Sequence, residues 1–355
     1  MLVHFILLLA GLVAISKYKK KSCLIFSFFI IGIFAILRYN YGSDYISYNR
    51  WFEHIKSGGE SPYKNEIGFT ILNQISPSFQ ILIAITSIFF LIIIYKLLSN
   101  NLSPFFAGLG FIVFIINPYL FLMNLSAIRQ CIALCIFVVS LKFAYERKFL
   151  IYCAFIMFAT LFHSTVILLL PIYFVAHGKK LARFDVIIIL VVFCVLMLEN
   201  SLLEKLVDLG LVFFNNNNYY HYIDSGVGNS LRATILTGVS FVYVLINLTK
   251  LRDKHLMYAK LYLIGLTFGM LAHQFSMFTR FQMYFDIFSI VTLPGIINYY
   301  SCSDESKVAK IINIYIFPIL ILLIYLLRYL SFFFTPRWDS FKVYHTIFEK
   351  IIEVL

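Results

Sequence analysis

Apolar runs long enough, or nearly long enough, to cross a lipid bilayer recur from one end of the chain to the other. A transmembrane helix takes about 20 apolar residues, whereas a soluble domain needs a charged surface to stay hydrated. Only 13% of the 355 residues are charged, and 61% are hydrophobic. The chain is therefore predicted to be an all-α, polytopic integral membrane protein.

Counting these runs predicts about 12 transmembrane helices, some of them short or partly re-entrant. The expected spans are 2–16, 23–38, 79–98, 104–121, 131–145, 149–162, 164–177, 185–199, 231–248, 257–272, 281–299 and 310–328. They form a single polytopic membrane domain over residues 1–355, with longer outer segments at 39–78 and 199–230 and a C-terminal tail at 329–355.

The net charge of +12 gathers in short clusters between apolar runs: "KYKKK", "ERK", "GKKLAR" and "KLRDK". With 12 helices all four clusters fall on one side, which the positive-inside rule makes cytoplasmic. Both termini then lie outside. The sequence shows no basic helix or stacked aromatic platform of a nucleic-acid module, so nucleic acid is not an expected partner.

Three arginines lie at outer helix ends, against the positive-inside bias: Arg38, Arg129 and Arg280. Any one of them alone fits an interfacial side chain that snorkels to water. Three on one side favour a shared ligand, because the planar guanidinium fork matches phosphate oxygens. These arginines are the predicted diphosphate-binding residues.

His163, Asp44 and Glu66 are the candidate proton acceptors on the outer side. A histidine at a helix end often caps a carbonyl, and loop carboxylates are usually solvated. Imidazole, however, takes a proton near neutral pH, and a carboxylate beside aromatic rings can grip a sugar hydroxyl. Tyr45 and Tyr48 follow Asp44 and are suited to stack on sugar rings. The sequence has no metal-binding or nucleotide-binding motif in a credible context, so neither group is expected.

Five stretches occur in a characteristic order: "RYNYGSDYISYNRWF", "NEIGFTILN", "LSAIRQCIALCIF", "ATLFHSTVILLLPIYF" and "TRFQMYFDIFSIVTLPGII". Over roughly residues 1–300 the chain resembles the EpsG-type, Wzy-like polysaccharide polymerases. The final helix and the tail show no motif of that family.

The resemblance implies a multi-pass protein of the bacterial inner membrane, acting in O-antigen (lipopolysaccharide), capsule or exopolysaccharide assembly. Such polymerases move a glycan chain from undecaprenyl diphosphate onto a lipid-linked repeat unit at the periplasmic face. The expected activity is that of a metal-independent glycosyltransferase without cofactor, similar to the helical lipid-dependent membrane glycosyltransferases. Expected partners are lipid-linked repeat units, membrane lipids, a chain-length regulator and a flippase.

Carried over residue by residue, the resemblance points to Arg38, Asp44, Tyr45, Glu66, Arg129, His163, Arg280 and Tyr284. The arginines would stabilise negative charge on the leaving diphosphate. His163, Asp44 and Glu66 compete as the base, with His163 favoured. Sugar contacts are expected from Tyr45, Tyr284, Tyr219, Tyr220 and Tyr222.

Two other functions stay open on the residues alone. A lipid-linked oligosaccharide flippase would also need arginines for diphosphate and about twelve helices. A membrane O-acyltransferase acting on the glycan would need an acyl donor path, usually with a cytoplasmic His–acid pair.

Overall fold

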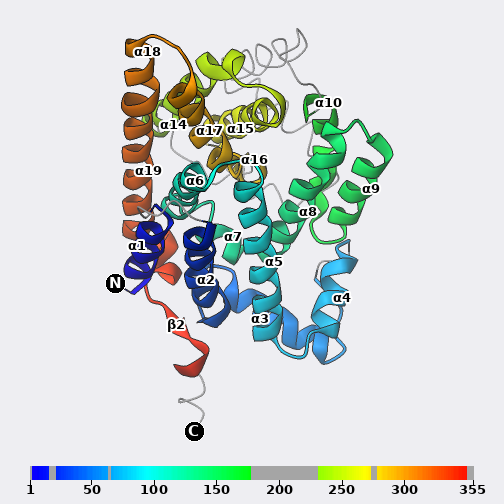
Figure 1. Cartoon of the computed structure of the whole chain (residues 1–355). Helices are drawn as coiled ribbons and strands as arrows, with labels where there is room; N and C mark the ends of the chain where they lie inside the picture. Colours follow the sequence, from blue (N-terminus) through cyan, green and yellow to red (C-terminus); the bar gives the residue numbers. More distant parts are fainter. Residues whose placement is uncertain (1, 16–20, 63–64, 177–230, 273–277, 350–355) are drawn as a thin grey trace. The chain divides into compact units, whose positions relative to one another are not determined.

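A computed structural model describes residues 2–15, 21–62, 65–176, 231–272 and 278–349 of the chain. The fold is almost entirely helical, as predicted (Figure 1). The described residues form one sheet, in which β1 (Arg38–Tyr39) pairs antiparallel with β2 (His345–Thr346). The chain divides into two compact units: unit 1 is Met1–His177 with Leu322–Leu355, and unit 2 is Gly178–Ile321.

Among the described residues, three helices are long and apolar enough to cross a membrane: α5 (Phe79–Ser99), α8 (Ile128–Tyr145) and the continuous stretch Lys307–Phe334. Five apolar helices are shorter, over Val3–Ala14, Lys21–Leu37, Pro104–Ile116, Phe149–Thr160 and Ile235–Lys250. The chain is a helical membrane protein. The count of about 12 spans and the single domain over 1–355 stay predictions, and the expected span 185–199 lies outside the described residues.

Unit 1 is built around α2 (Lys21–Leu37), which contacts α1 (Leu2–Ala14), α5 and α6 (Pro104–Ile116). Beyond α5 follow α8 and then α9 (Phe149–Thr160). Aromatic rings fill the core between α2, α5 and α6. The ring centres of Phe28 and Phe111 lie 5.0 Å apart, and those of Phe90 and Phe114 lie 5.7 Å apart.

The outer segment 39–78, expected to be a loop, contains two helices, α3 (Tyr45–Lys56) and α4 (Ile67–Ile75). Figure 1 shows both at the lower ends of α2 and α5. The helix α3 buries one face, formed by Tyr45, Tyr48, Phe52 and Ile55. This is the spacing of an amphipathic helix, which a search for apolar runs overlooks.

Two expected continuous helices are wrong, because each is interrupted. The described part of the expected span 164–177 is a 3₁₀ helix, η1 (Ser164–Leu169), followed by α10 (Ile172–Ala176). Pro171 separates them, because proline lacks an N–H group and clashes with the preceding turn. The stretch 281–299 consists of α16 (Phe278–Asp286) and α17 (Ser289–Cys302), and the Ser289 hydroxyl donates to the Asp286 carbonyl at the break, at 2.6 Å.

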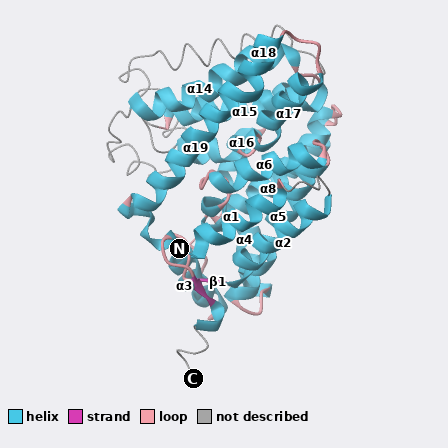
Figure 2. Ribbon diagram, turned by 60° about the vertical axis from the view of Figure 1, so that its left-hand side comes forward, coloured by secondary structure: helices cyan, strands magenta, loops and turns pink. Residues whose placement is uncertain are grey.

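The C-terminal tail of unit 1 folds back onto the end of α2. After α19 (Phe317–Phe334) and the 3₁₀ helix η5 (Pro336–Phe341), strand β2 pairs with β1 directly after α2. The Tyr344 hydroxyl donates to the Phe34 carbonyl at 2.8 Å, and the two rings stack at 4.5 Å. Figure 2 shows β1 beside α3, where the Tyr39 and Tyr45 rings meet at 5.9 Å.

In unit 2, α15 (Asp253–Leu271) contacts α14 (Leu231–Asn247), α16 and α17. A short helix α18 (Lys307–Ile311) continues into a π-helical turn, η4 (Ile312–Ile316). Buried amides connect these elements: Asn247 donates to the Asn313 side chain at 2.8 Å and accepts from the Tyr300 hydroxyl at 2.8 Å. The Tyr243 hydroxyl donates to the Asn313 carbonyl, so the irregular turn keeps its hydrogen bonding.

Candidate functional site

The Glu66 carboxylate contacts three groups from two separate parts of unit 1, the start of α8 and the turn that leads into η1. Nη1 of Arg129 donates to Oε2 in an ion pair. At Oε1, Nδ1 of His163 lies at 3.2 Å and the Ser164 backbone N–H donates at 3.2 Å. The side chains of Glu66 and His163 are each 6% exposed, and that of Arg129 is 15% exposed. We call Arg129, Glu66 and His163 the acid–base cluster.

The cluster forms because α4 docks onto the turn between α9 and η1. Glu66 precedes the first residue of α4, and the Phe69 N–H donates to the Leu161 carbonyl of that turn at 3.2 Å. A Cβ atom on Gly68 would lie 2.9 Å from the Leu161 Cβ and 3.1 Å from its carbonyl oxygen. Gly68 therefore permits the approach that brings Glu66 to His163. Sequence reasoning missed this residue, although a glycine two positions after the acid in "NEIGF" was the available signal.

Arg129 lies in the first turn of α8 and also contacts α3. Its Nε donates to the Tyr48 hydroxyl at 3.2 Å, and its guanidinium carbon lies 5.8 Å from the centre of the Tyr48 ring. The Tyr48 ring packs edge-on against Phe69 at 5.7 Å. Tyr48 is buried, and these contacts hold Arg129 in place, while the stacking of Tyr48 on a sugar ring stays a prediction.

The surroundings of Glu66 determine its charge. Burial raises the pKa of the carboxyl, but the hydrogen bond from His163 and the positive charge of Arg129 outweigh burial, so the pKa is lowered from its usual value. Glu66 is thus ionised near neutral pH, and such an acidic carboxylate is a weak base. An ionised carboxylate can only accept a hydrogen bond, so Nδ1 of His163 carries the proton and donates the hydrogen bond to Glu66. Nε2 is then the basic nitrogen of the neutral ring.

Arg38 has a different environment at the same end of unit 1. Arg38 is 1% exposed. Its guanidinium donates to the Ala35 carbonyl, to the Ser87 hydroxyl at 2.6 Å and to the Leu125 carbonyl at 3.0 Å. These contacts join α2, α5 and α7 (Leu122–Ser126). The contact between Arg38 and a diphosphate stays a prediction, and it would require the guanidinium to leave these acceptors.

Asp44 is half-exposed on the loop before α3, and its backbone N–H donates to the Ser126 hydroxyl at 3.1 Å. Gly42 has a φ of 109°, and a Cβ there would lie 3.1 Å from the same hydroxyl oxygen. The loop therefore docks closely on α7, just before Arg129. Tyr45 is buried against Tyr39 and Phe79, and burial raises its pKa to about 12. The structure shows Tyr45 in a packing position, and its sugar contact stays a prediction.

The comparison with known families decides the identity of the chain. The model of the EpsG family matches residues 3–346. The chain belongs to the EpsG family. The match continues through α19 and β2, so the expectation that the final helix and the tail carry no family signal is wrong. No curated protein and no solved structure matches the chain.

The other predicted residues of this EpsG-family protein lie in unit 2 or outside the described ranges. Arg280 is half-buried on α16, and Tyr284, one turn further along the helix, is fully buried. On the same helix, Gln282 donates to Asp286 at 2.7 Å. Their participation in one site with the acid–base cluster stays a prediction. Tyr219, Tyr220 and Tyr222 lie outside the described residues.

The described part of this EpsG-family chain contains no group of three or more His, Cys, Asp or Glu side chains placed to hold a metal ion. What it does contain in unit 1 is an ionised carboxylate, an imidazole oriented by it and a guanidinium beside both. This set of groups can accept a proton and stabilise negative charge at one place.

Proposed function

We propose that this protein is an oligosaccharide repeat-unit polymerase of the bacterial inner membrane, with its active site facing the periplasm. It would transfer the growing glycan from undecaprenyl diphosphate onto a lipid-linked repeat unit. Membership of the EpsG family supports a polymerase-like role in polysaccharide synthesis. The observation that carries the proposed reaction is the acid–base cluster, with His163 bonded to Glu66 beside Arg129.

In the proposed reaction a hydroxyl oxygen of the acceptor sugar attacks the anomeric carbon of the donor glycan. The new C–O bond forms as the bond between that carbon and the diphosphate oxygen breaks. The hydroxyl proton passes to Nε2 of His163, while Glu66 holds the imidazole through Nδ1. The diphosphate leaves with the bonding electron pair, and no oxidant, reductant or nucleotide is consumed.

Arg129 is the proposed stabiliser of the leaving diphosphate in unit 1. Negative charge grows on the leaving oxygen in the transition state, and a guanidinium already held in place stabilises it without reorganisation. In this structure one amino group of Arg129 is bonded to Glu66. A substrate phosphate would therefore compete with Glu66 for Arg129, which couples the arrival of the donor to the position of the base. Arg280 remains the proposed second contact.

The experiment that tests this function measures glycan length. The purified protein in detergent micelles is incubated with lipid-linked repeat units, and the products are separated by size. A polymerase lengthens the glycan although micelles have only one compartment, whereas a flippase leaves it unchanged. Glu66→Gln should lose most of the extension. The matched control is Glu53→Gln, at an exposed carboxylate of α3 that should not affect the reaction.

Unchanged glycan with folded, monodisperse protein would exclude the polymerase and leave the flippase. A glycan that gains only the mass of an acyl group, when an acyl donor is supplied, would indicate an O-acyltransferase instead. The proposed periplasmic location of the site is checked separately with a reporter fused at Gly178. The reporter should indicate a cytoplasmic location, because the predicted topology places Gly178 on the side opposite to His163.

A further inference from the structure

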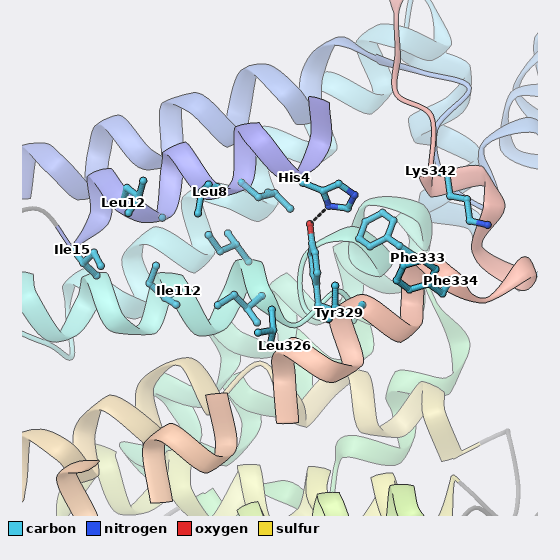
Figure 3. Close-up of a pocket in the computed structure, with 15 residues that line it drawn as sticks. His4, Leu8, Leu12, Ile15, Ile112, Leu326, Tyr329, Phe333, Phe334 and Lys342 are labelled. Atoms are coloured by element: carbon cyan, nitrogen blue, oxygen red, sulfur yellow. Dashed lines mark hydrogen bonds between the residues drawn. The ribbon is translucent and has the colours of Figure 1, made fainter. Parts of the chain in front are cut away.

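Unit 1 contains a cavity of about 600 Å³ between α1, α6 and α19, whose lining includes none of the acid–base cluster residues (Figure 3). Its walls are almost entirely hydrocarbon, including Leu8, Leu12, Ile112 and Leu326. The volume falls within the range of roughly 300–1,000 Å³ that is usual for pockets that bind small ligands. We call this cavity the slot.

The slot has the length of one leaflet of a bilayer. The α1 residues that line it run from His4 to Ile15, which corresponds to about 16 Å at a rise of 1.5 Å per residue. The hydrocarbon core of a bilayer is about 30 Å thick, so each leaflet contributes about half of that. A transmembrane helix of a partner protein would extend through both leaflets, whereas a single lipid chain ends where the slot ends.

The slot opens sideways, toward the surroundings of the helices. Lining side chains on both of its edges are exposed: Leu8 is 62% exposed and Leu12 57% on α1, and Leu330 is 45% exposed on α19. In a helical membrane protein, apolar side chains that are exposed along the spans face lipid. A lipid chain can therefore enter the slot directly from the bilayer.

Among the described residues that line the slot, the polar side chains gather at one end. Nδ1 of His4 lies 2.6 Å from the Tyr329 hydroxyl, and Lys342 lies at the same end in Figure 3, opposite Ile15. Lys342 is paired with Asp339 at 2.6 Å, but the two side chains are 40% and 62% exposed, so the pair is weak. The ammonium group can therefore turn to an anionic headgroup.

This polar end lies at the same end of unit 1 as Arg38. The tail that carries Lys342 pairs through β2 with β1, which directly follows α2. A lipid in the slot would thus have its headgroup at the face to which α3 and α4 also belong.

We propose that the slot binds one acyl chain of an anionic phospholipid, with the phosphate of its headgroup at Lys342. The apolar lining, the one-leaflet length and the lysine among the described lining residues each match this occupant. The chain of the undecaprenyl carrier is much longer than the slot and would extend far beyond it. The proposal does not depend on the polymerase reaction, because it concerns lipid binding alone.

Native mass spectrometry of the detergent-purified protein tests this proposal. The probes are phosphatidylglycerol and phosphatidylcholine with identical acyl chains, added in increasing amounts. We expect the wild-type protein to retain one phosphatidylglycerol with about tenfold preference over phosphatidylcholine. Lys342→Gln should abolish the preference. The matched control is Lys307→Gln, which removes a lysine of α18 that does not line the slot.

A second pair of variants tests the slot itself. Leu12→Trp should reduce phosphatidylglycerol retention about tenfold, because the indole fills the slot. Leu9→Trp, at a 43% exposed position of α1 outside the lining, should leave retention unchanged. Equal retention of both lipids by the wild-type protein, or equal effects of the two tryptophan variants, would overturn the proposal. Displacement of the bound phosphatidylglycerol by undecaprenyl phosphate would also overturn it, by assigning the slot to the carrier.

Discussion

Arg38 and Arg129 have the same position in the sequence pattern, at an outer helix end, but different surroundings in unit 1. Arg38 is enclosed by two backbone carbonyls and a serine hydroxyl, which are neutral acceptors. Arg129 is bonded to a carboxylate that also holds an imidazole. Neutral acceptors around a buried guanidinium join helices, whereas ionisable partners create a set of charges that a substrate can rearrange. We therefore propose that Arg38 mainly stabilises the fold and that Arg129 takes part in the chemistry.

The largest expected effect on stability is that of Arg38→Ala. Removing the guanidinium leaves the Ala35 and Leu125 carbonyls and the Ser87 hydroxyl without their donor, which should lower the free energy of unfolding by about 3 kcal/mol. The measurement is the thermal midpoint of the purified protein in detergent. Arg38→Lys should recover only part of the loss, because an ammonium group cannot reproduce the planar fork. An Arg38→Ala protein that is stable but inactive would place Arg38 in the substrate site instead.

Arg129→Lys should affect the rate of chain extension more than the stability of the protein, the reverse of Arg38→Ala. The charge remains but the fork is lost, so we expect chain extension to slow about tenfold, equivalent to about 1.4 kcal/mol, while the thermal midpoint changes little. The glycan length distribution reports the change. Arg50→Lys on the exposed side of α3 is the control and should behave as the wild type. Near-normal polymer length in Arg129→Lys would remove Arg129 from the diphosphate role.

The lowered pKa of Glu66 gives the third prediction. The native carboxyl is more acidic than the unfolded one, so its contribution to stability is complete above the usual pKa of 4.5 and is lost as the pH falls through the lower native value. At pH 7 we expect Glu66→Gln to be less stable than the wild type by about 1 kcal/mol. The difference in thermal midpoint should shrink below pH 4.5. A difference that grows in acid would mean that the native pKa of Glu66 is raised.

Tyr48→Phe should produce the smallest change. The variant keeps the ring under the guanidinium and removes only the hydroxyl that accepts from Nε of Arg129 at 3.2 Å. We expect a loss of stability of about 0.5 kcal/mol and a two- to threefold slower extension, within the usual range for one hydrogen bond. Tyr95→Phe, on α5, serves as a control for removal of a tyrosine hydroxyl elsewhere in unit 1. A loss comparable to that of Arg129→Lys would show that the hydroxyl contacts substrate.

Much of the helical fold was predictable because apolar runs report helices that pack in a membrane. The runs at 79–98 and 131–145 agree closely with α5 and α8. The amphipathic α3 was not found this way, since its buried face depends on spacing and not on a continuous run. The break at Pro171 was visible in the sequence, but the apolar residues around it suggested a single span.

The candidate site was predictable by residue type but not by partner. The sequence identified Glu66, Arg129 and His163 as outer polar residues, yet the hydrogen bonds between them join positions 63 and 97 residues apart. The role of Arg38 depends equally on distant partners, Ser87 and Leu125, which no local pattern reveals. The same holds for the tail, which meets β1 only in the folded chain.

The most direct test of the central claim is the rate of chain extension by purified His163→Ala in detergent micelles. If His163, oriented by Glu66, takes the proton of the attacking hydroxyl, the rate should fall at least about 100-fold in protein that remains folded, with a loss of thermal midpoint similar to that of Glu66→Gln. Added imidazole should restore part of the rate, because it can replace the missing base. A His163→Ala protein that extends glycans within about threefold of the wild-type rate would contradict the account, since base catalysis contributes at least about 100-fold.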